Sequence, residues 1–264
     1  MLQHFNLQTY PFRKDIPVEN LSLSRSQKQA TEVLQEVLCT KEIGILIGEP
    51  GTGKSVTLEH LAKKLPRGNF KLISLSDPQG PPRYIWRYLA RQLGIDAPGP
   101  DAFRGLLRQL LFFKEETGRQ PLLLIDEAHQ LRPETIEELR LLTNVTLDNI
   151  CPCISILAGQ PELITRLNNP VYEAFNQRVG VRFRLMPLGE EETCNYIDSH
   201  LRFAGAIHQV FDDGAKQLIF TFTRGIPRRI NRSCLNALTY AYQHELTQIN
   251  ADTVKQATEE SMDI

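Results

Sequence analysis

The sequence predicts an α/β protein in which helices sandwich a parallel sheet, followed by a small all-α domain. Two observations support this fold class. Over the first 187 residues, short apolar runs of strand length alternate with segments of helical periodicity, which favours a parallel sheet covered on both faces. Beyond Pro187 the strand signals fade, and helical patterns punctuated by glycines follow. We therefore predict two domains, residues 1–187 with a short N-terminal extension and residues 188–264.

The elements of the first domain are predicted in chain order. A helix is expected over residues 24–40, where Ala30, Leu34 and Val37 recur at helical spacing, and a buried strand follows from Ile43 to Ile47. After a Gly-rich turn and a second helix, further strands are predicted at residues 70–75, 121–125, 154–158 and 181–185. Intervening helices are predicted at residues 83–93, 102–115 and 134–148.

The second domain is predicted to be a helical lid. Its helices are expected at residues 190–203, 212–223, 227–245 and 251–260. Asp212 and Asn250 have the side chains that cap helix N-termini, and they precede the second and the last of these helices.

Composition excludes several classes of protein. With 30 Lys+Arg against 31 Asp+Glu and 41% hydrophobic residues, the chain is neither a disordered protein nor a general polycation. Residues 1–187 carry 23 basic and 20 acidic side chains, so a polyanion is expected to meet this part. No run approaches the ~18 apolar residues of a membrane span. A cytoplasmic protein without a membrane segment is expected. The five cysteines lack metal or disulfide spacing and are interpreted as buried or unreactive thiols.

The most specific motif lies between the first predicted strand and the next helix, the context that a phosphate-binding loop requires. It reads Gly48-Glu49-Pro50-Gly51-Thr52-Gly53-Lys54-Ser55, followed by Val56. Its glycines let backbone N–H groups converge on phosphate oxygens, and the helix N-terminus adds partial positive charge. We expect Lys54 to reach the β- and γ-phosphates of ATP and Ser55 to bind Mg²⁺. The alternative is a glycine-rich turn that matches by chance.

Two acidic residues end the fully apolar strand at residues 121–125. Asp126 is expected to hold the hydration shell of Mg²⁺, and Glu127 to orient or deprotonate the water that attacks the γ-phosphate. The alternative is that both acids only cap the helix that follows. His129 is interpreted as a residue that packs or bonds locally.

The order of these elements resembles the AAA+ ATPase superfamily over nearly the whole chain. That resemblance implies a polar residue that senses the γ-phosphate after the next strand, where Gln160 is the candidate and Ser155 the weaker one. A turn residue without this role is the alternative for Gln160. It also implies a second sensor in the lid, and Arg228 opens a predicted helix there after Pro227.

The same resemblance implies an arginine that a neighbouring subunit contributes to the site. Arg178 lies where this residue is expected, before the last strand, and its guanidinium would stabilise the charge that develops on the γ-phosphate. A homo-oligomer is therefore expected. Arg182 and Arg184 alternate with apolar residues and are interpreted as the polar face of a strand.

Five segments carry a more specific resemblance: residues 5–12, 48–55, 157–163, 176–178 and 225–231. Together they resemble the ExeA-like family. This family includes ATPase domains of secretion-apparatus assembly proteins and transposon-encoded ATPases similar to the phage Mu B protein. The secretion members continue into a membrane span and a cell-wall-binding domain, and this chain stops at Ile264. We therefore expect the transposition class: an ATP-dependent ring, spiral or filament on double-stranded DNA that recruits or stimulates a transposase or accessory protein.

Two other functions stay open. One is an ATPase of a secretion or pilus assembly system, and the other is a replication-initiator or chaperone-loader ATPase. DNA binding would depend on rows of basic residues, each of which has a solvated helix face as its alternative. Tyr84 and Trp86 either stack bases or lie in the core. The rows are Lys63, Lys64, Arg67 and Lys71; Arg83, Arg87 and Arg91; and Arg104 and Arg108.

Overall fold

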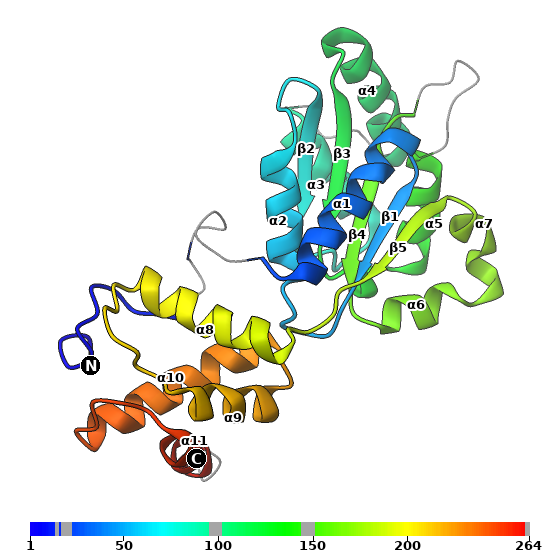
Figure 1. Ribbon diagram of the computed structural model, residues 1–264. Helices are drawn as coiled ribbons and strands as arrows, with labels where there is room; N and C mark the ends of the chain where they lie inside the picture. The colour runs from blue at the N-terminus through cyan, green and yellow to red at the C-terminus, as the bar shows by residue number, and fades with distance from the viewer. Residues whose placement is uncertain (14–15, 17–22, 95–101, 144–150, 262–264) are drawn as a thin grey trace. The chain divides into compact units, whose positions relative to one another are not determined.

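The computed structural model describes residues 1–13, 16, 23–94, 102–143 and 151–261 of the chain. They form two compact units (Figure 1). The α/β unit comprises Gln27–Pro50 and Lys54–Leu185, and the helical unit comprises Met1–Ser26, Gly51–Gly53 and Met186–Ile264.

The α/β unit is built on a five-stranded parallel sheet with the strand order β2-β3-β4-β1-β5. The central strands β1, β3 and β4 are buried along nearly their whole length because helices cover both faces. The sheet confirms the predicted fold class. Its strands are β1 (Ile43–Ile47), β2 (Phe70–Leu75), β3 (Gln120–Ile125), β4 (Ile154–Gly159) and β5 (Val179–Arg184).

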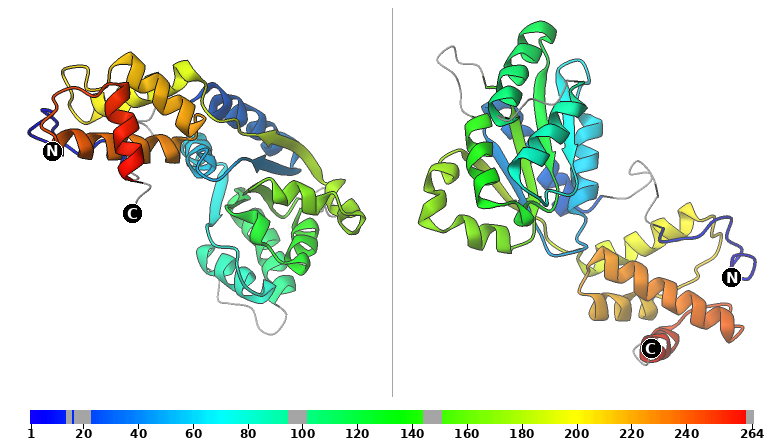
Figure 2. Two further views of the ribbon diagram at one scale, coloured as in Figure 1. Left: turned by 90° about the horizontal axis from the view of Figure 1, so that it is seen from below. Right: turned by 180° about the vertical axis from the view of Figure 1, so that it is seen from behind.

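Helices pack on both faces of this sheet (Figures 1 and 2). On one face, α1 (Arg25–Thr40) and α2 (Lys54–Lys64) bury side chains such as Leu34 and Leu61. On the other, α3 (Pro82–Gln92), α4 (Ala102–Thr117) and α5 (Pro133–Leu142) form a second cluster. Trp86 lies in that cluster, and its indole N–H donates to the carboxylate of Glu138, which links α3 to α5. The helix predicted at residues 134–148 ends at Leu142, and residues 144–150 lie outside the described part.

Short elements connect the carboxyl ends of β3 and β4 to the rest of the unit. A single 3-10 turn, η2 (Ala128–Gln130), follows the two acids after β3. After β4 come α6 (Glu162–Leu167), the 3-10 turn η3 (Pro170–Tyr172) and α7 (Glu173–Asn176). The edge strand β5 alternates half-buried and exposed residues, with Arg182 and Arg184 exposed, as the interpretation of a polar strand face expects.

The helical unit consists of α8 (Glu190–Phe203), α9 (Asp213–Thr223), α10 (Pro227–Gln243) and α11 (Ala251–Glu260). The two predicted caps form: Asp212 accepts a hydrogen bond from the Ala215 N–H at 2.7 Å, and Asn250 accepts one from the Thr253 N–H at 2.9 Å. The N-terminal segment joins this unit through Phe5, Leu7 and Phe12, whereas the sequence assigned it to residues 1–187. These apolar side chains bury against the helices.

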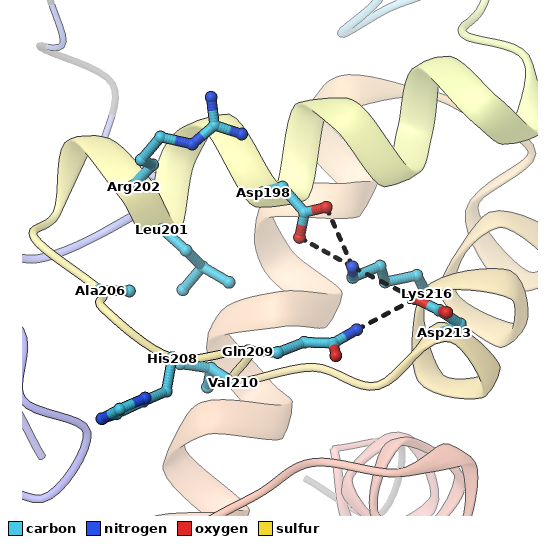
Figure 3. A pocket seen from close by; sticks show the side chains of 9 residues that line it. All are labelled: Asp198, Leu201, Arg202, Ala206, His208, Gln209, Val210, Asp213 and Lys216. Carbon is cyan, nitrogen blue, oxygen red and sulfur yellow. Dashed lines mark hydrogen bonds and ion pairs between the residues drawn. The ribbon is translucent and has the colours of Figure 1, made fainter.

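A buried lysine, Lys216, links α9 to α8 through ion pairs within the helical unit (Figure 3). The Lys216 ammonium lies 2.8 Å from Asp198 Oδ1 and 3.5 Å from Asp213 Oδ1, and its side chain is 5% exposed. A pocket of about 420 Å³ opens beside this pair, with Arg202 and His208 also on its wall. The pair neutralises a charge that would otherwise be costly to bury.

None of the helices in the described residues is long and apolar enough to cross a membrane. The five cysteines are free thiols, of which Cys151, Cys153 and Cys234 are buried and Cys39 is exposed. Among the described residues no three His, Cys, Asp or Glu side chains come together as a ready metal cluster.

Candidate active site

The predicted phosphate loop connects β1 to α2 at the carboxyl edge of the sheet. The Gly48 N–H donates to the Gly159 carbonyl at 3.2 Å, so the loop starts beside the end of β4. Gly51 and Gly53 adopt φ angles of 84° and 99°, a region that glycine occupies without strain. Glu49 and Pro50 are exposed, Thr52 is buried, and Val56 is half-buried in the first turn of α2.

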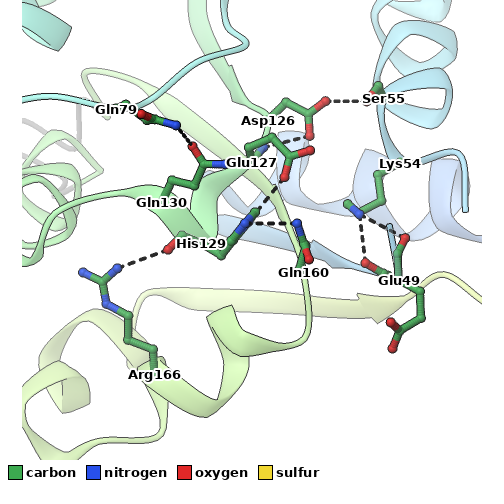
Figure 4. Close-up of polar contacts among 11 residues, drawn as sticks. Glu49, Lys54, Ser55, Gln79, Asp126, Glu127, His129, Gln130, Gln160 and Arg166 are labelled. Atoms are coloured by element: carbon green, nitrogen blue, oxygen red, sulfur yellow. Dashed lines mark hydrogen bonds and ion pairs between the residues drawn. The ribbon is translucent and has the colours of Figure 1, made fainter. Parts of the chain in front are cut away.

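Lys54 begins α2 and turns its side chain back onto the loop (Figure 4). Its ammonium donates to the Gly48 carbonyl at 2.8 Å and to the Glu49 carbonyl at 3.2 Å. The residue is 6% exposed. A buried ammonium bonded to carbonyl oxygens at a helix N-terminus marks a position where an anion is favoured by charge and by the helix dipole.

Ser55 meets Asp126 across 71 residues of sequence. The Ser55 hydroxyl donates to Asp126 Oδ2 at 2.5 Å, and Asp126 Oδ1 accepts the Glu127 N–H at 2.8 Å. A hydroxyl and one carboxylate are too few to enclose a cation. They fit Mg²⁺ bound in the usual way, through one or two protein oxygens together with waters and substrate phosphates.

Glu127 stands in an unusual backbone conformation. Its φ and ψ angles are 49° and 35°, in the left-handed region that residues other than glycine rarely adopt. The turn η2 starts directly after it and brings His129 back toward the Glu127 carboxylate, with His129 Nδ1 3.4 Å from Glu127 Oε2. The left-handed residue therefore decides where both side chains point.

Gln160 follows β4 and lies beside this turn. Its side-chain Nε2 is 3.1 Å from His129 Nε2, so the sensor candidate and the second acid share one neighbour (Figure 4). Ser155 lies near the start of β4, fully buried and paired in register with Ile43 and Leu123, away from the carboxyl edge. Of the two sensor candidates, only Gln160 is at the edge where Ser55 and Asp126 meet.

Arg166 also belongs to this cluster, and sequence reasoning missed it. It extends from α6, donates to the Leu131 carbonyl, and reaches the His129 carbonyl at 3.4 Å. Its Nε also lies 3.3 Å from the Tyr172 hydroxyl. Arg166 thus fixes the backbone of η2 beside the acidic pair. The only signal in the sequence was its place four residues after Glu162, which does not reveal a contact with residues 129–131.

Arg178 lies at the other end of the strands. Its carbonyl accepts the Ile43 N–H at 2.8 Å, at the amino end of β1, whereas the phosphate loop follows the carboxyl end. The five residues of β1 separate the two, roughly 17 Å of extended chain. The Arg178 side chain is exposed, and this chain's own loop is beyond its reach.

Arg228 lies in the first turn of α10 in the helical unit, preceded by Pro227 at the first helical position. Within that unit its N–H donates to the Gly51 carbonyl at 3.3 Å. A Cβ on Gly51 would lie 2.6 Å from the Cβ of Arg228, so this approach requires glycine. Both Arg228 and Arg229 are exposed.

The rows of basic residues differ in their surroundings. Lys63 pairs with Glu59 at 3.1 Å on α2. On α3, by contrast, Arg83 and Arg91 are exposed and Arg87 is half-buried, and no acidic residue occurs in that helix. Tyr84 and Tyr88 are 55% and 45% exposed beside them, while Trp86 is core. A pocket of about 330 Å³ lies next to both tyrosines.

Comparison with known proteins identifies the domain family of one segment of the chain. Residues 38–167 match the family model described as AAA domain. This segment is an AAA domain. General secretion pathway protein A of Aeromonas hydrophila is 32% identical over 202 residues, which cover 75% of this chain and 37% of that protein. The chain is homologous to it but spans little more than a third of its length.

Solved structures resemble this chain over nearly its whole length. The Aeropyrum pernix ORC2 protein gives a TM-score of 0.69 at 16% identity and covers 94% of this chain and 71% of its own. The structure of Drosophila ORC bound to DNA gives a TM-score of 0.65 at 17% identity, and the match covers 96% of this chain and 70% of that chain. At these identities the likeness shows the fold alone, which is the AAA+ P-loop fold with a helical C-terminal part.

Proposed function

We propose that this protein is an ATPase that hydrolyses ATP to ADP and phosphate. The observation that carries the proposal is the meeting of Ser55 and Asp126 at 2.5 Å, directly after Lys54 and directly before Glu127. Phosphoryl transfer needs positioning and charge rather than covalent chemistry, and these four side chains supply both.

Each residue has a role in this reaction. The loop N–H groups and Lys54 bind the β- and γ-phosphates. Ser55 and Asp126 are the residues that would hold Mg²⁺, which would neutralise charge on these phosphates. Glu127 takes a proton from the attacking water as its oxygen bonds to the γ-phosphorus. The bond from that phosphorus to the bridging oxygen breaks, and ADP leaves with the electron pair. Gln160 and Arg228 contact the phosphates as sensors.

Replacing Glu127 tests this proposal. Glu127→Gln keeps size and removes the base, so we expect the ATP affinity to stay within about twofold while kcat falls by roughly 10²- to 10⁴-fold. Fluorescent-nucleotide titration and phosphate release measure the two quantities. Glu134→Gln, an exposed acid in the first turn of α5, is the matched control. Full hydrolysis by Glu127→Gln would remove Glu127 from the role of base.

We further propose that the protein oligomerises, with Arg178 of one subunit reaching the nucleotide of the next. The exposure of Arg178 at the far edge of the sheet supports this arrangement. The oligomer would assemble on double-stranded DNA with ATP and regulate transposition by selecting targets and recruiting a transposase. Hydrolysis then weakens the interface, because the neighbour's guanidinium loses the γ-phosphate that it binds.

The exposed face of α3 supports the DNA partner. Arg83, Arg87 and Arg91 recur every four residues, so one helix face presents three cations to phosphates. Tyr84 and Tyr88 add flat apolar surface beside them. One observation favours a second function, an ATPase of a secretion system: the relative at 32% identity is General secretion pathway protein A.

A DNA titration separates these two functions. With a non-hydrolysable ATP analogue, we expect the protein to retain duplex DNA on filters at about 50 mM salt and to lose it steeply by about 200 mM. Charge reversal of Arg83, Arg87 and Arg91 should flatten the salt slope by about 0.9 for each DNA phosphate that is no longer neutralised. The same reversal of Lys63, Lys64 and Arg67 is the control. Absence of binding at both salt concentrations would favour the secretion ATPase.

A further inference from the structure

The imidazole of His129 lies between the second acid and the sensor candidate (Figure 4). Its Nδ1 is 3.4 Å from Glu127 Oε2, and its Nε2 is 3.1 Å from the side-chain nitrogen of Gln160. The His129 side chain is 17% exposed. Neither His129 Nδ1 nor Glu127 Oε2 has another hydrogen-bond partner among the described residues, although both atoms are buried. The two atoms face each other without a fully formed bond.

The distribution of hydrogens in this group follows from donor and acceptor chemistry. An amide nitrogen only donates, so His129 Nε2 accepts from Gln160, and the ring proton of a neutral imidazole is on Nδ1. That proton points to the Glu127 carboxylate. Turning the Gln160 amide over would place its oxygen on Nε2 and shift the ring proton there, and a bare Nδ1 would then face a negative oxygen. The orientation of Gln160 therefore decides whether His129 attracts Glu127.

The backbone around His129 is held firmly enough to transmit such a change. Arg166 binds the carbonyls on both sides of Gln130. A Cβ on Gly159 would lie 3.3 Å from the backbone nitrogen of His129, so the end of β4 packs closely on η2. The left-handed conformation of Glu127 fixes the direction in which its side chain leaves the backbone. A change within this group would therefore be a change of side-chain orientation.

We propose that His129 is the positioning residue through which Gln160 sets the direction of the Glu127 carboxylate. The proposal rests on the proposed function, in which Glu127 is the base and Gln160 contacts the γ-phosphate. The Gln160 amide has two N–H groups, one for His129 and one for a phosphate oxygen. With the γ-phosphate present, the Gln160 amide donates to His129 and to the phosphate at once. His129 Nδ1–H then donates to Glu127 Oε2, and the other carboxylate oxygen of Glu127 faces the attacking water. Once the phosphate leaves, the Gln160 amide can rotate, and Glu127 loses the hydrogen bond from His129.

Two side-chain replacements separate the contacts of His129. The amide of Asn ends where Nδ1 stands, and the amide of Gln ends near Nε2. His129→Asn therefore keeps a donor to Glu127 without the contact to Gln160, and His129→Gln does the reverse. We expect His129→Ala to lower kcat by roughly 10- to 100-fold, a part of what a positioned base contributes. His129→Asn should recover most of that activity, and His129→Gln little.

A double-mutant cycle tests the coupling to Gln160. Gln160→Ala should lower kcat several-fold in the parent chain, and by a clearly smaller factor when His129 is already Ala or Asn, because the residue it acts through is gone. Nucleotide affinity of the His129 variants should stay within about twofold of the parent. Equal factors for Gln160→Ala in all backgrounds would overturn the proposal, as would parental kcat in His129→Ala.

The controls distinguish this proposal from the proposed function. Gln130→Ala changes the same turn, but the Gln130 amide oxygen accepts a hydrogen bond from Gln79 at 2.7 Å rather than bonding to Glu127 or Gln160, so this variant should keep the parental kcat. Thermal unfolding of each variant identifies loss of fold, and His129→Asn keeps the test available if His129→Ala does not fold. If Glu127→Gln is inactive and His129→Ala is fully active, the positioning role of His129 is wrong, and the proposed function is not affected. If Glu127→Gln is active, the assignment of Glu127 as the base is wrong.

Discussion

Each of the two units buries a lysine and encloses a histidine, but their partners differ. In the α/β unit, Lys54 bonds to backbone carbonyls and His129 has a polar side chain beside each ring nitrogen. In the helical unit, Lys216 bonds to the carboxylate of Asp198. His200 stacks on Phe12 and contacts the tilted ring of Tyr196, and neither of its nitrogens has a hydrogen-bond partner among the described residues.

This comparison separates side chains that can exchange partners from side chains that hold the fold. A phosphate competes well with a carbonyl oxygen for an ammonium group, because it adds a full charge. It competes poorly with a carboxylate already in place. The same residue types therefore serve binding in one unit and packing in the other, and their surroundings decide which.

Replacing the two lysines should produce opposite results and gives the largest effects. Lys54→Met removes a charge-assisted bond to phosphate, so we expect ATP affinity to fall by roughly 10- to 100-fold with little change in stability. Lys216→Met leaves Asp198 without its cation and should lower the free energy of unfolding by about 1–3 kcal/mol, with ATP affinity unchanged. Nucleotide titration and urea unfolding followed by circular dichroism measure these quantities. If Lys216→Met weakens ATP binding as much as Lys54→Met does, the two lysines do not differ in role as stated.

His200 should make the stability of the protein depend on pH. Burial lowers the pKa of His200 from 6.5 to about 4. Between these values the unfolded chain binds a proton that the folded chain does not, so stability falls as pH drops from 6.5 toward 4 and is unaffected above that range. The difference corresponds to at most about 3 kcal/mol. His200→Phe keeps the aromatic stack and should flatten urea midpoints across this range. An unchanged pH slope would contradict the assignment.

The sequence predicted well those features that depend on nearby residues. The loop at residues 48–55 is recognisable from its own spacing and flanks. Asp126 beside Ser55 was also predictable, because parallel strands end at one edge of a sheet and each residue follows a strand or its loop. Arg178 was placed before the last strand, and the structure puts it there.

What the sequence could not predict depends on which strands are neighbours and on single backbone angles. His129 reaches Gln160 only because β3 and β4 pair and because Glu127 adopts positive φ, and neither follows from periodicity. The pattern of α3 left Tyr84 and Trp86 equivalent, yet one is exposed and the other is core. Packing against α4 and α5, which lie further along the chain, decides between them.

The position of Arg178 at the amino edge of the sheet has a consequence for any assembly that uses it. A copy that donates an arginine from one edge and receives one at the opposite edge makes a heterologous contact, so the two surfaces that meet are unlike. A row of such copies has direction: one terminal copy keeps an unmatched arginine, and the other keeps an unfinished nucleotide pocket. Unless the row closes on itself, its two ends would grow and shorten at different speeds.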